Sequence, residues 1–156
     1  MEIPENIPLF TISAAATILK ISIPTLRLYE KEGLIISYKS KSNQRMYSKI
    51  DLERVECIRR AIKEEKISIN GIKTIYSLIP CWDLVKCGEQ DRKKCSAYNE
   101  IHKPCWSYKN NETICEPNNC RECTVYKDYS KCDDIKDLIK NISKGKEWGH
   151  FQEEDS

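Results

Sequence analysis

The sequence predicts a mainly α protein: a winged helix-turn-helix domain followed by a small, irregular cysteine-rich module. Two short helical patterns that meet across Lys20 and Ile21 indicate the helix-turn-helix. Two strand-like runs on either side of a polar turn follow Gly33 and indicate a hairpin, or wing. Eight of the 9 cysteines lie within residues 81–132, which indicates that this part of the chain is built differently.

The two helices of the predicted pair have recognisable ends. Ser13 is the expected N-cap of the first helix, which continues through a run of good helix formers. Ser22 caps the second helix, and Pro24 stands in its first turn, where a missing N–H costs nothing. Gly33 is expected to end this helix in the left-handed conformation. The spacing is that of a helix-turn-helix whose second helix can enter a DNA major groove.

A hairpin and two more helices complete the first domain. Basic side chains at the hairpin tip and on its return strand suit phosphate oxygens, and they are Lys39, Lys41, Arg45 and Lys49. Ser48 and Asp51 are spaced as a capping box that opens a long third helix. A fourth helix over residues 69–79 carries isoleucines at helical spacing and stops at Pro80.

Three motifs in this order resemble the DNA-binding domain of the MerR family, closest to its heat-shock repressor branch. They are Thr25-Leu26-Arg27-Leu28-Tyr29-Glu30-Lys31-Glu32-Gly33-Leu34, Arg45-Met46-Tyr47-Ser48 and Asp51-Leu52. The resemblance covers residues 9–79 and implies a homodimer on an inverted-repeat operator in double-stranded promoter DNA, with RNA polymerase as an indirect partner. It also implies DNA contacts by Thr25, Arg27, Tyr29, Arg45 and Tyr47, to which the charge of the hairpin adds Lys39 and Lys41. For Tyr29, packing beneath the wing is the alternative.

The cysteine-rich segment contains an internal repeat. The first copy is Cys81-Trp82, Cys87 and Cys95-Ser96-Ala97-Tyr98, and the second is Cys105-Trp106, Cys115 and Cys123-Thr124-Val125-Tyr126. Seven residues lie between Cys87 and Cys95 in the first copy and between Cys115 and Cys123 in the second. This register argues against accidental cysteine enrichment and predicts two similar loops around a common centre. The segment also resembles a Cys-Trp-repeat module appended to bacterial signalling proteins and regulators.

A bound metal is expected to stabilise the fold of this module, because the segment has too few apolar residues for a large core. Candidate ligands are Cys81, Cys87, Cys95, Cys105, Cys115, Cys120, Cys123 and Cys132, of which an unspecified four would bind. Thiolate-only ligation with long, uneven gaps favours an iron–sulfur cluster. Zinc is the alternative, although structural zinc usually shows two Cys-x-x-Cys pairs and this chain has a single one, at residues 120–123. A metal-free dithiol switch is a third interpretation. Cys57 stands apart and is expected to be a small buried hydrophobe.

Four segments follow from these patterns. Residues 9–79 form the DNA-binding domain, 80–132 the metal-binding or sensor module, 133–143 a short helix that is a candidate dimer contact, and 144–156 a disordered tail. Pro80 blocks the long helix with which such dimers usually form a coiled coil, so the later helix or the module must serve instead.

The predicted function is transcription regulation, without enzymatic activity, by a protein that senses redox state, oxygen, nitric oxide or metal. The alternative is a constitutive DNA-binding protein in which structural zinc supports dimerisation or partner binding. A redox enzyme is disfavoured because nothing indicates a substrate pocket or a general acid–base pair. No apolar run is long enough to span a membrane, and the acidic start is unlike a secretory signal, so a cytoplasmic location is expected.

Overall fold

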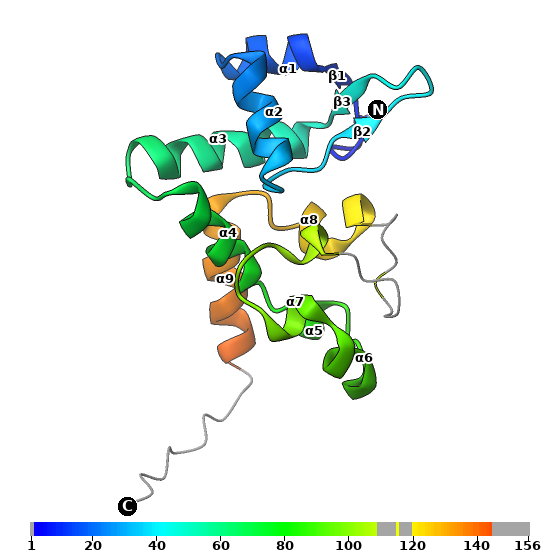
Figure 1. Ribbon diagram of the computed structural model, residues 1–156, viewed down its shortest axis with the longest axis vertical. Coiled ribbons are helices and arrows are strands. Elements are labelled where there is room, and N and C mark those ends of the chain that lie inside the picture. Colours follow the sequence, from blue (N-terminus) through cyan, green and yellow to red (C-terminus); the bar gives the residue numbers. More distant parts are fainter. Residues whose placement is uncertain (1, 109–114, 116–119, 145–156) are drawn as a thin grey trace, which may run out of the picture.

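The computed structural model describes residues 2–108, 115 and 120–144, and it places most of them in short helices (Figure 1). In this view the chain up to and including the long helix α3 lies above the second half, and α4 lies lower, at the height of α8 and α9. The elements in chain order are β1 (Phe10–Thr11), α1 (Ile12–Leu19), α2 (Ile23–Lys31), β2 (Tyr38–Lys39), β3 (Arg45–Tyr47), α3 (Lys49–Lys63), α4 (Ile69–Ser77), α5 (Cys81–Leu84), α6 (Glu89–Lys94), α7 (Ser96–Asn99), η1 (Cys105–Ser107), η2 (Cys120–Glu122), α8 (Thr124–Lys127) and α9 (Cys132–Ser143).

The helix-turn-helix and the wing are present as predicted. Helices α1 and α2 are followed by the antiparallel pair β2 and β3, in which Tyr38 pairs with Met46. A third strand, β1, pairs with the other edge of β3 and places Phe10 opposite Tyr47. The sequence analysis missed β1, because two residues are too few to show the alternation of a strand.

Side-chain caps start the helices of this half, with one difference from expectation. The N-cap of α1 is Thr11, whose hydroxyl accepts the Ala14 N–H at 3.2 Å, so the prediction of Ser13 is wrong. Ser22 caps α2 as predicted and accepts the Thr25 N–H at 3.2 Å.

The predicted stop after α2 and the predicted capping box of α3 are also confirmed. Gly33 has φ +74°, the left-handed conformation that glycine adopts without strain. The Ser48 backbone N–H donates to Asp51 Oδ2 at 2.7 Å, and the Asp51 N–H donates back to Ser48 Oγ at 3.3 Å. Both residues are almost fully buried, so this cap is part of the protein interior.

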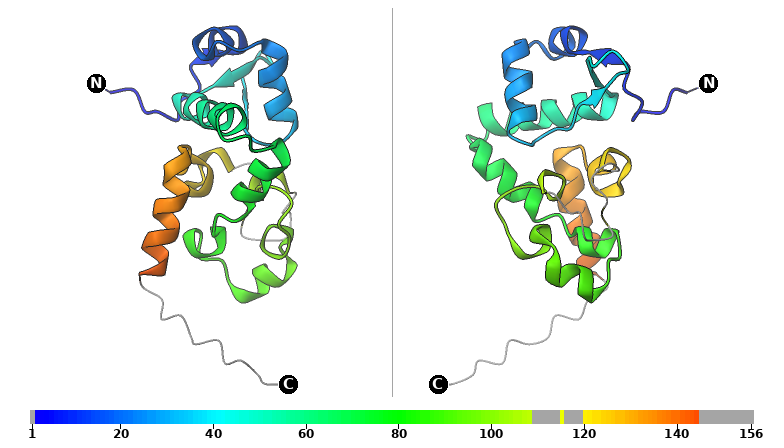
Figure 2. Two further views of the ribbon diagram at one scale, coloured as in Figure 1. Left: turned by 90° about the vertical axis from the view of Figure 1, so that its left-hand side faces the viewer. Right: turned by 45° about the vertical axis from the view of Figure 1, so that its right-hand side comes forward.

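One apolar core extends through both halves of the chain. It joins first-half residues such as Leu26 and Ile58 to Val125, Ile135 and Leu138 of the second half. The segments predicted at residues 9–79 and 80–132 therefore share this core. Helix α9 lies below α3 in Figures 1 and 2. Its apolar side faces the core, so the face expected to be available for a dimer contact is used within the chain.

Cys57, on α3, is half-buried and disulfide-bonded, so the prediction that it acts as a small buried hydrophobe is wrong. The tail predicted at residues 144–156 lies outside the described residues apart from Lys144. Over the parts of the chain that the structure describes, no helix combines the length and the apolar character needed to cross a bilayer.

Candidate functional site

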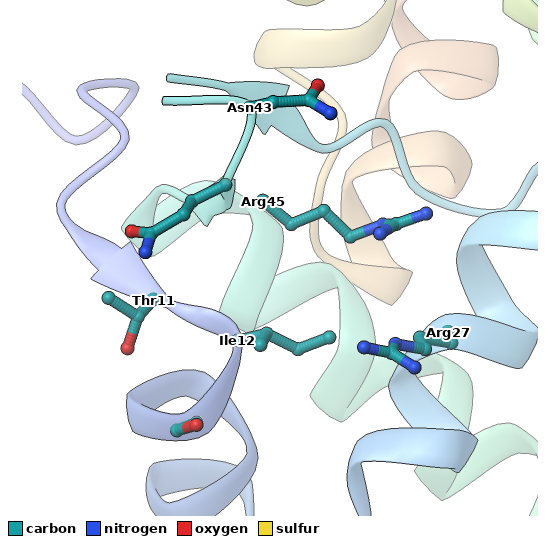
Figure 3. A pocket seen from close by; sticks show the side chains of 7 residues that line it. Thr11, Ile12, Arg27, Asn43 and Arg45 are labelled. Atoms are coloured by element: carbon teal, nitrogen blue, oxygen red, sulfur yellow. The ribbon is translucent and has the colours of Figure 1, made fainter. Parts of the chain in front are cut away.

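A groove of about 400 Å³ lies between the recognition helix α2, the start of α1 and the hairpin. Arg27 comes from α2 and Arg45 from β3, and Figure 3 shows both guanidinium groups on the same side of the groove. The other lining residues are Thr11, Ile12, Ser13, Asn43 and Gln44. Segments from four parts of the first half thus place two fixed positive charges and several polar groups around one opening.

Glu30 holds Arg45 in position. The Nε of Arg45 donates to both carboxylate oxygens of Glu30, at 2.9 and 3.2 Å. Glu30 also accepts the hydroxyls of Ser37 at 2.8 Å and of Tyr47 at 3.3 Å. Both bonds from Arg45 use Nε, and its side chain is 40% exposed, so the terminal nitrogens face solvent where a phosphate or a guanine edge can meet them.

Five of the seven predicted DNA contacts are accessible to a ligand. Arg27 is exposed in the middle of α2, and Lys39 and Lys41 are exposed on the hairpin. Arg45 and Thr25 are half-buried, and the Thr25 hydroxyl lies 2.8 Å from Ser22 Oγ at the start of α2. Arg27 and Arg45 share the groove, and the other three residues add to the accessible surface at the start of α2 and on the hairpin.

The two predicted tyrosines do not belong to this surface. Tyr29 is 6% exposed and Tyr47 is fully buried, and both pack in the core. Burial and the neighbouring Glu30 carboxylate hold the pKa of Tyr47 well above its usual value. The expectation that Tyr29 and Tyr47 contact DNA is therefore corrected: their rings support the surface from beneath, which was the alternative for Tyr29.

Sequence reasoning missed four polar residues that line the groove. Thr11 ends β1, Ser13 lies in the first turn of α1, and Asn43 and Gln44 lie in the wing turn. Asn43 has φ +61°, a conformation that asparagine tolerates better than most residues. Their position in sequence between Lys41 and Arg45, two predicted DNA contacts, could have indicated that Asn43 and Gln44 belong to the same site.

The structure gathers cysteines from both copies of the repeat. The thiols of Cys81 and Cys105, which occupy equivalent positions, are hydrogen-bonded to each other. This bond lowers the pKa of Cys81 and, together with burial, raises the pKa of Cys105. The charges of Cys120 and Cys123 raise the pKa of Cys105 further, so these thiols lie in one neighbourhood.

Cys115 and Cys95 belong to the same neighbourhood. Burial raises the pKa of Cys115 to about 11, and the charges of Cys81, Cys123, Cys95 and Cys120 add to this effect. None of these interactions includes Cys87. The side chain of Cys132 is outside the description. As the described residues stand, no three His, Cys, Asp or Glu side chains are arranged to hold a metal ion.

The aromatic residues confirm the internal repeat. Trp82 and Tyr98 of the first copy form an edge-to-face pair with ring centroids 5.2 Å apart and an interplanar angle of 87°. Trp106 and Tyr126 of the second copy form the same pair, at 5.1 Å and 87°. In both copies the third cysteine is the N-cap of a four-residue helix that carries the tyrosine. Over the described residues, the two copies therefore share this aromatic pair and this short helix.

A winged helix-turn-helix whose recognition helix and wing line one cationic groove defines a class of double-stranded DNA-binding protein. Residues 10–78 match the family described as MerR HTH family regulatory protein, and this half of the chain is a MerR-type helix-turn-helix domain. The matched family is one of regulators, not enzymes.

One curated relative was also found. It is a protein of Streptomyces coelicolor (strain ATCC BAA-471 / A3(2) / M145) named as heat shock protein HspR, and it is 32% identical over 77 residues. The alignment covers 49% of this chain and 51% of the relative, so the chain spans about half the length of the relative it matches. No solved structure matched the chain.

Proposed function

We propose that the protein is a transcriptional regulator that binds an inverted-repeat operator in promoter DNA as a homodimer. The observation that carries the proposal is the groove in which Arg27 of the recognition helix and Arg45 of the wing face one opening. Guanidinium groups bind phosphate in a bidentate manner and also read guanine in the major groove. The match of residues 10–78 to a family of regulators supports this use of the groove.

We further propose that the cysteine module carries an iron–sulfur cluster, through which the regulator senses redox state, oxygen, nitric oxide or metal. The donor set supports this, because thiols from Cys81, Cys105, Cys120 and Cys123 lie in one neighbourhood and iron–sulfur clusters are held by cysteine thiolates. Zinc bound by the same thiolates is the second candidate, in which case the protein binds DNA constitutively and the metal serves stability.

The DNA-binding part is tested with Arg27→Ala and Arg45→Ala. Each is expected to weaken binding to a duplex selected in vitro with the full chain by about 1–3 kcal/mol if it reads a base. Arg60→Ala is the matched control, because Arg60 is an exposed arginine of α3 that does not line the groove. Fluorescence anisotropy at several salt concentrations measures the effect. An equal loss in Arg60→Ala would show that the groove has no special role.

The cofactor part is tested on protein purified anaerobically, by its absorption spectrum and its content of iron, sulfide and zinc. Replacement of Cys81, Cys105 or Cys123 by serine is expected to remove most of the metal. Cys87→Ser is the matched control, since Cys87 takes no part in the thiol interactions described above. A colourless protein with stoichiometric zinc would favour the constitutive alternative. Full metal content in all three serine variants would contradict any metal site in this neighbourhood.

A further inference from the structure

We infer that the Trp106–Tyr126 pair transmits the state of the cysteine cluster to the DNA-binding surface, and that the intact cluster favours tight operator binding. By the cysteine cluster we mean Cys81, Cys105, Cys120 and Cys123. The inference deepens the proposed function and rests on it, since that function supplies both the operator and the signal. It names the route between two sites that the proposal leaves unconnected.

The pair is bonded to the segment that joins the recognition helix to the wing. Trp106 Nε1 donates to the Gly33 carbonyl oxygen at 2.7 Å. The Ile36 backbone N–H donates to the Tyr126 hydroxyl oxygen at 2.9 Å. Gly33 lies two residues after the end of α2, and Ile36 lies two residues before β2. One aromatic pair therefore contacts residues 33 and 36 of the segment that connects the helix of Arg27 to the hairpin of Arg45.

Tyr126 also reaches the helix after the wing. Its hydroxyl donates to Asp51 Oδ1 at 2.6 Å, and Asp51 is the buried residue that caps α3. Arg121, which lies between Cys120 and Tyr126 in sequence, forms an ion pair with Asp51 at 2.9 Å. The second repeat copy thus contacts the elements on both sides of the wing.

The same two aromatic residues are held by the cysteine cluster. Trp106 directly follows Cys105, whose free thiol forms a hydrogen bond with the thiol of Cys81. Cys123 is the N-cap residue of α8, the helix that carries Tyr126. Any change of ligation or oxidation state that moves Cys105 or Cys123 therefore moves one member of the pair through a connection of one to three residues.

Close packing leaves little room to absorb such a movement locally. The Arg54 guanidinium is completely buried and lies 5.0 Å from the centroid of Trp106 and 4.4 Å from that of Tyr126. Tyr126 itself is 2% exposed. Packed interiors of this density pass displacements on as discrete shifts instead of deforming continuously. The displacement is therefore passed to Gly33 and Ile36.

The first copy of the repeat provides a natural control. Trp82 and Tyr98 form an edge-to-face pair of the same geometry, yet Tyr98 is 42% exposed. The side-chain interactions described for this pair stay within the module, with Arg92 placed 5.9 Å from the Tyr98 ring centroid. Loss of this pair disturbs the module without touching the segment between α2 and β2.

The experiment compares Trp106→Phe and Tyr126→Phe with Trp82→Phe and Tyr98→Phe in the full chain. Each protein is prepared anaerobically, checked for metal content and cooperative melting, and studied before and after treatment with p-hydroxymercuribenzoate, which caps thiolates and displaces metals from them. The first readout is affinity for the in vitro selected duplex. The second is hydrogen–deuterium exchange of residues 33–37 in the absence of DNA.

In the parent, capping the thiols is expected to weaken duplex binding about 5- to 150-fold, the range of typical allosteric coupling. It is also expected to speed exchange in residues 33–37, because the Ile36 N–H loses its partner. In Trp106→Phe and Tyr126→Phe the ratio of the affinities before and after capping falls towards one. In Tyr126→Phe exchange at Ile36 is already fast before treatment, because the variant has no hydroxyl to accept its N–H. Trp82→Phe and Tyr98→Phe keep the response of the parent.

Two results would overturn the inference: a parent in which thiol capping leaves exchange of residues 33–37 unchanged, or a response lost equally in the variants of both copies. Failure of the proposed function is distinguishable, since it appears as the lack of any selected duplex or any bound metal, whatever the exchange data show.

Discussion

Replacing Gly33 with alanine is expected to destabilise the protein by about 2–3 kcal/mol, from two separable causes. The left-handed backbone at φ +74° costs a residue with a Cβ roughly 1–2 kcal/mol. The new Cβ would also lie 2.4 Å from Ser107 Oγ, so Ser107 must move and give up its 3.3 Å hydrogen bond to the Gly33 carbonyl. A hydrogen bond of this kind contributes about 0.5–1.5 kcal/mol.

A double-mutant cycle separates these causes. Ser107→Ala removes the clashing hydroxyl, so Gly33→Ala in that background should cost only the roughly 1–2 kcal/mol of backbone strain. Gly88→Ala is the matched control, because Gly88 has an ordinary φ of −73° and a Cβ there meets nothing within 4 Å. Urea unfolding followed by circular dichroism, with linear extrapolation, gives the free energies. Equal costs for Gly33→Ala in both backgrounds, or a cost matching that of Gly88→Ala, would refute the described contact between the module and the end of α2.

Three further predictions address the charges and the shared core. The double variant Lys39→Ala and Lys41→Ala should reduce the slope of log affinity against log salt by about 2 if both touch phosphate, and an unchanged slope would remove the wing tip from the interface. Asp51→Ala should lower the free energy of unfolding by about 3–5 kcal/mol, because it leaves Arg121 without its partner beside a buried site, and a loss under 1 kcal/mol in urea unfolding would contradict that. A fragment of residues 1–79 should not melt cooperatively in a calorimeter, because it lacks the second-half side chains of the common core, whereas a sharp transition like that of the full chain would show an independent domain.

Local signals in the sequence predicted the first half of the fold well. Ser22, Gly33 and the capping box of Ser48 and Asp51 could be found because each depends on residues within a few positions of one another. The position of α4 also followed from its isoleucines. Ile75 is the exception in that helix, since it is 39% exposed although its spacing placed it on the inner face.

The candidate site was only partly predictable, because side chains from distant segments decide it. Tyr47 and Arg45 both contact Glu30, which lies on another element, and nothing in their own neighbourhood in sequence shows which of them faces solvent. The repeat predicted that the cysteines share a centre. It could not show that Trp106 and Tyr126 turn towards the first half while Trp82 and Tyr98 do not.

The carboxylate of Glu30 makes the charge of Arg45 conditional. A phosphate that approaches this guanidinium competes with a negative charge already 2.9 Å away, so the first encounter with any stretch of DNA gains less than a free arginine would supply. In the proposed function, Glu30 repels any phosphate at this position but not a guanine edge, which carries no net charge. The ion pair therefore favours contact of Arg45 with a base over contact with the DNA backbone, and so favours sequence selectivity over affinity.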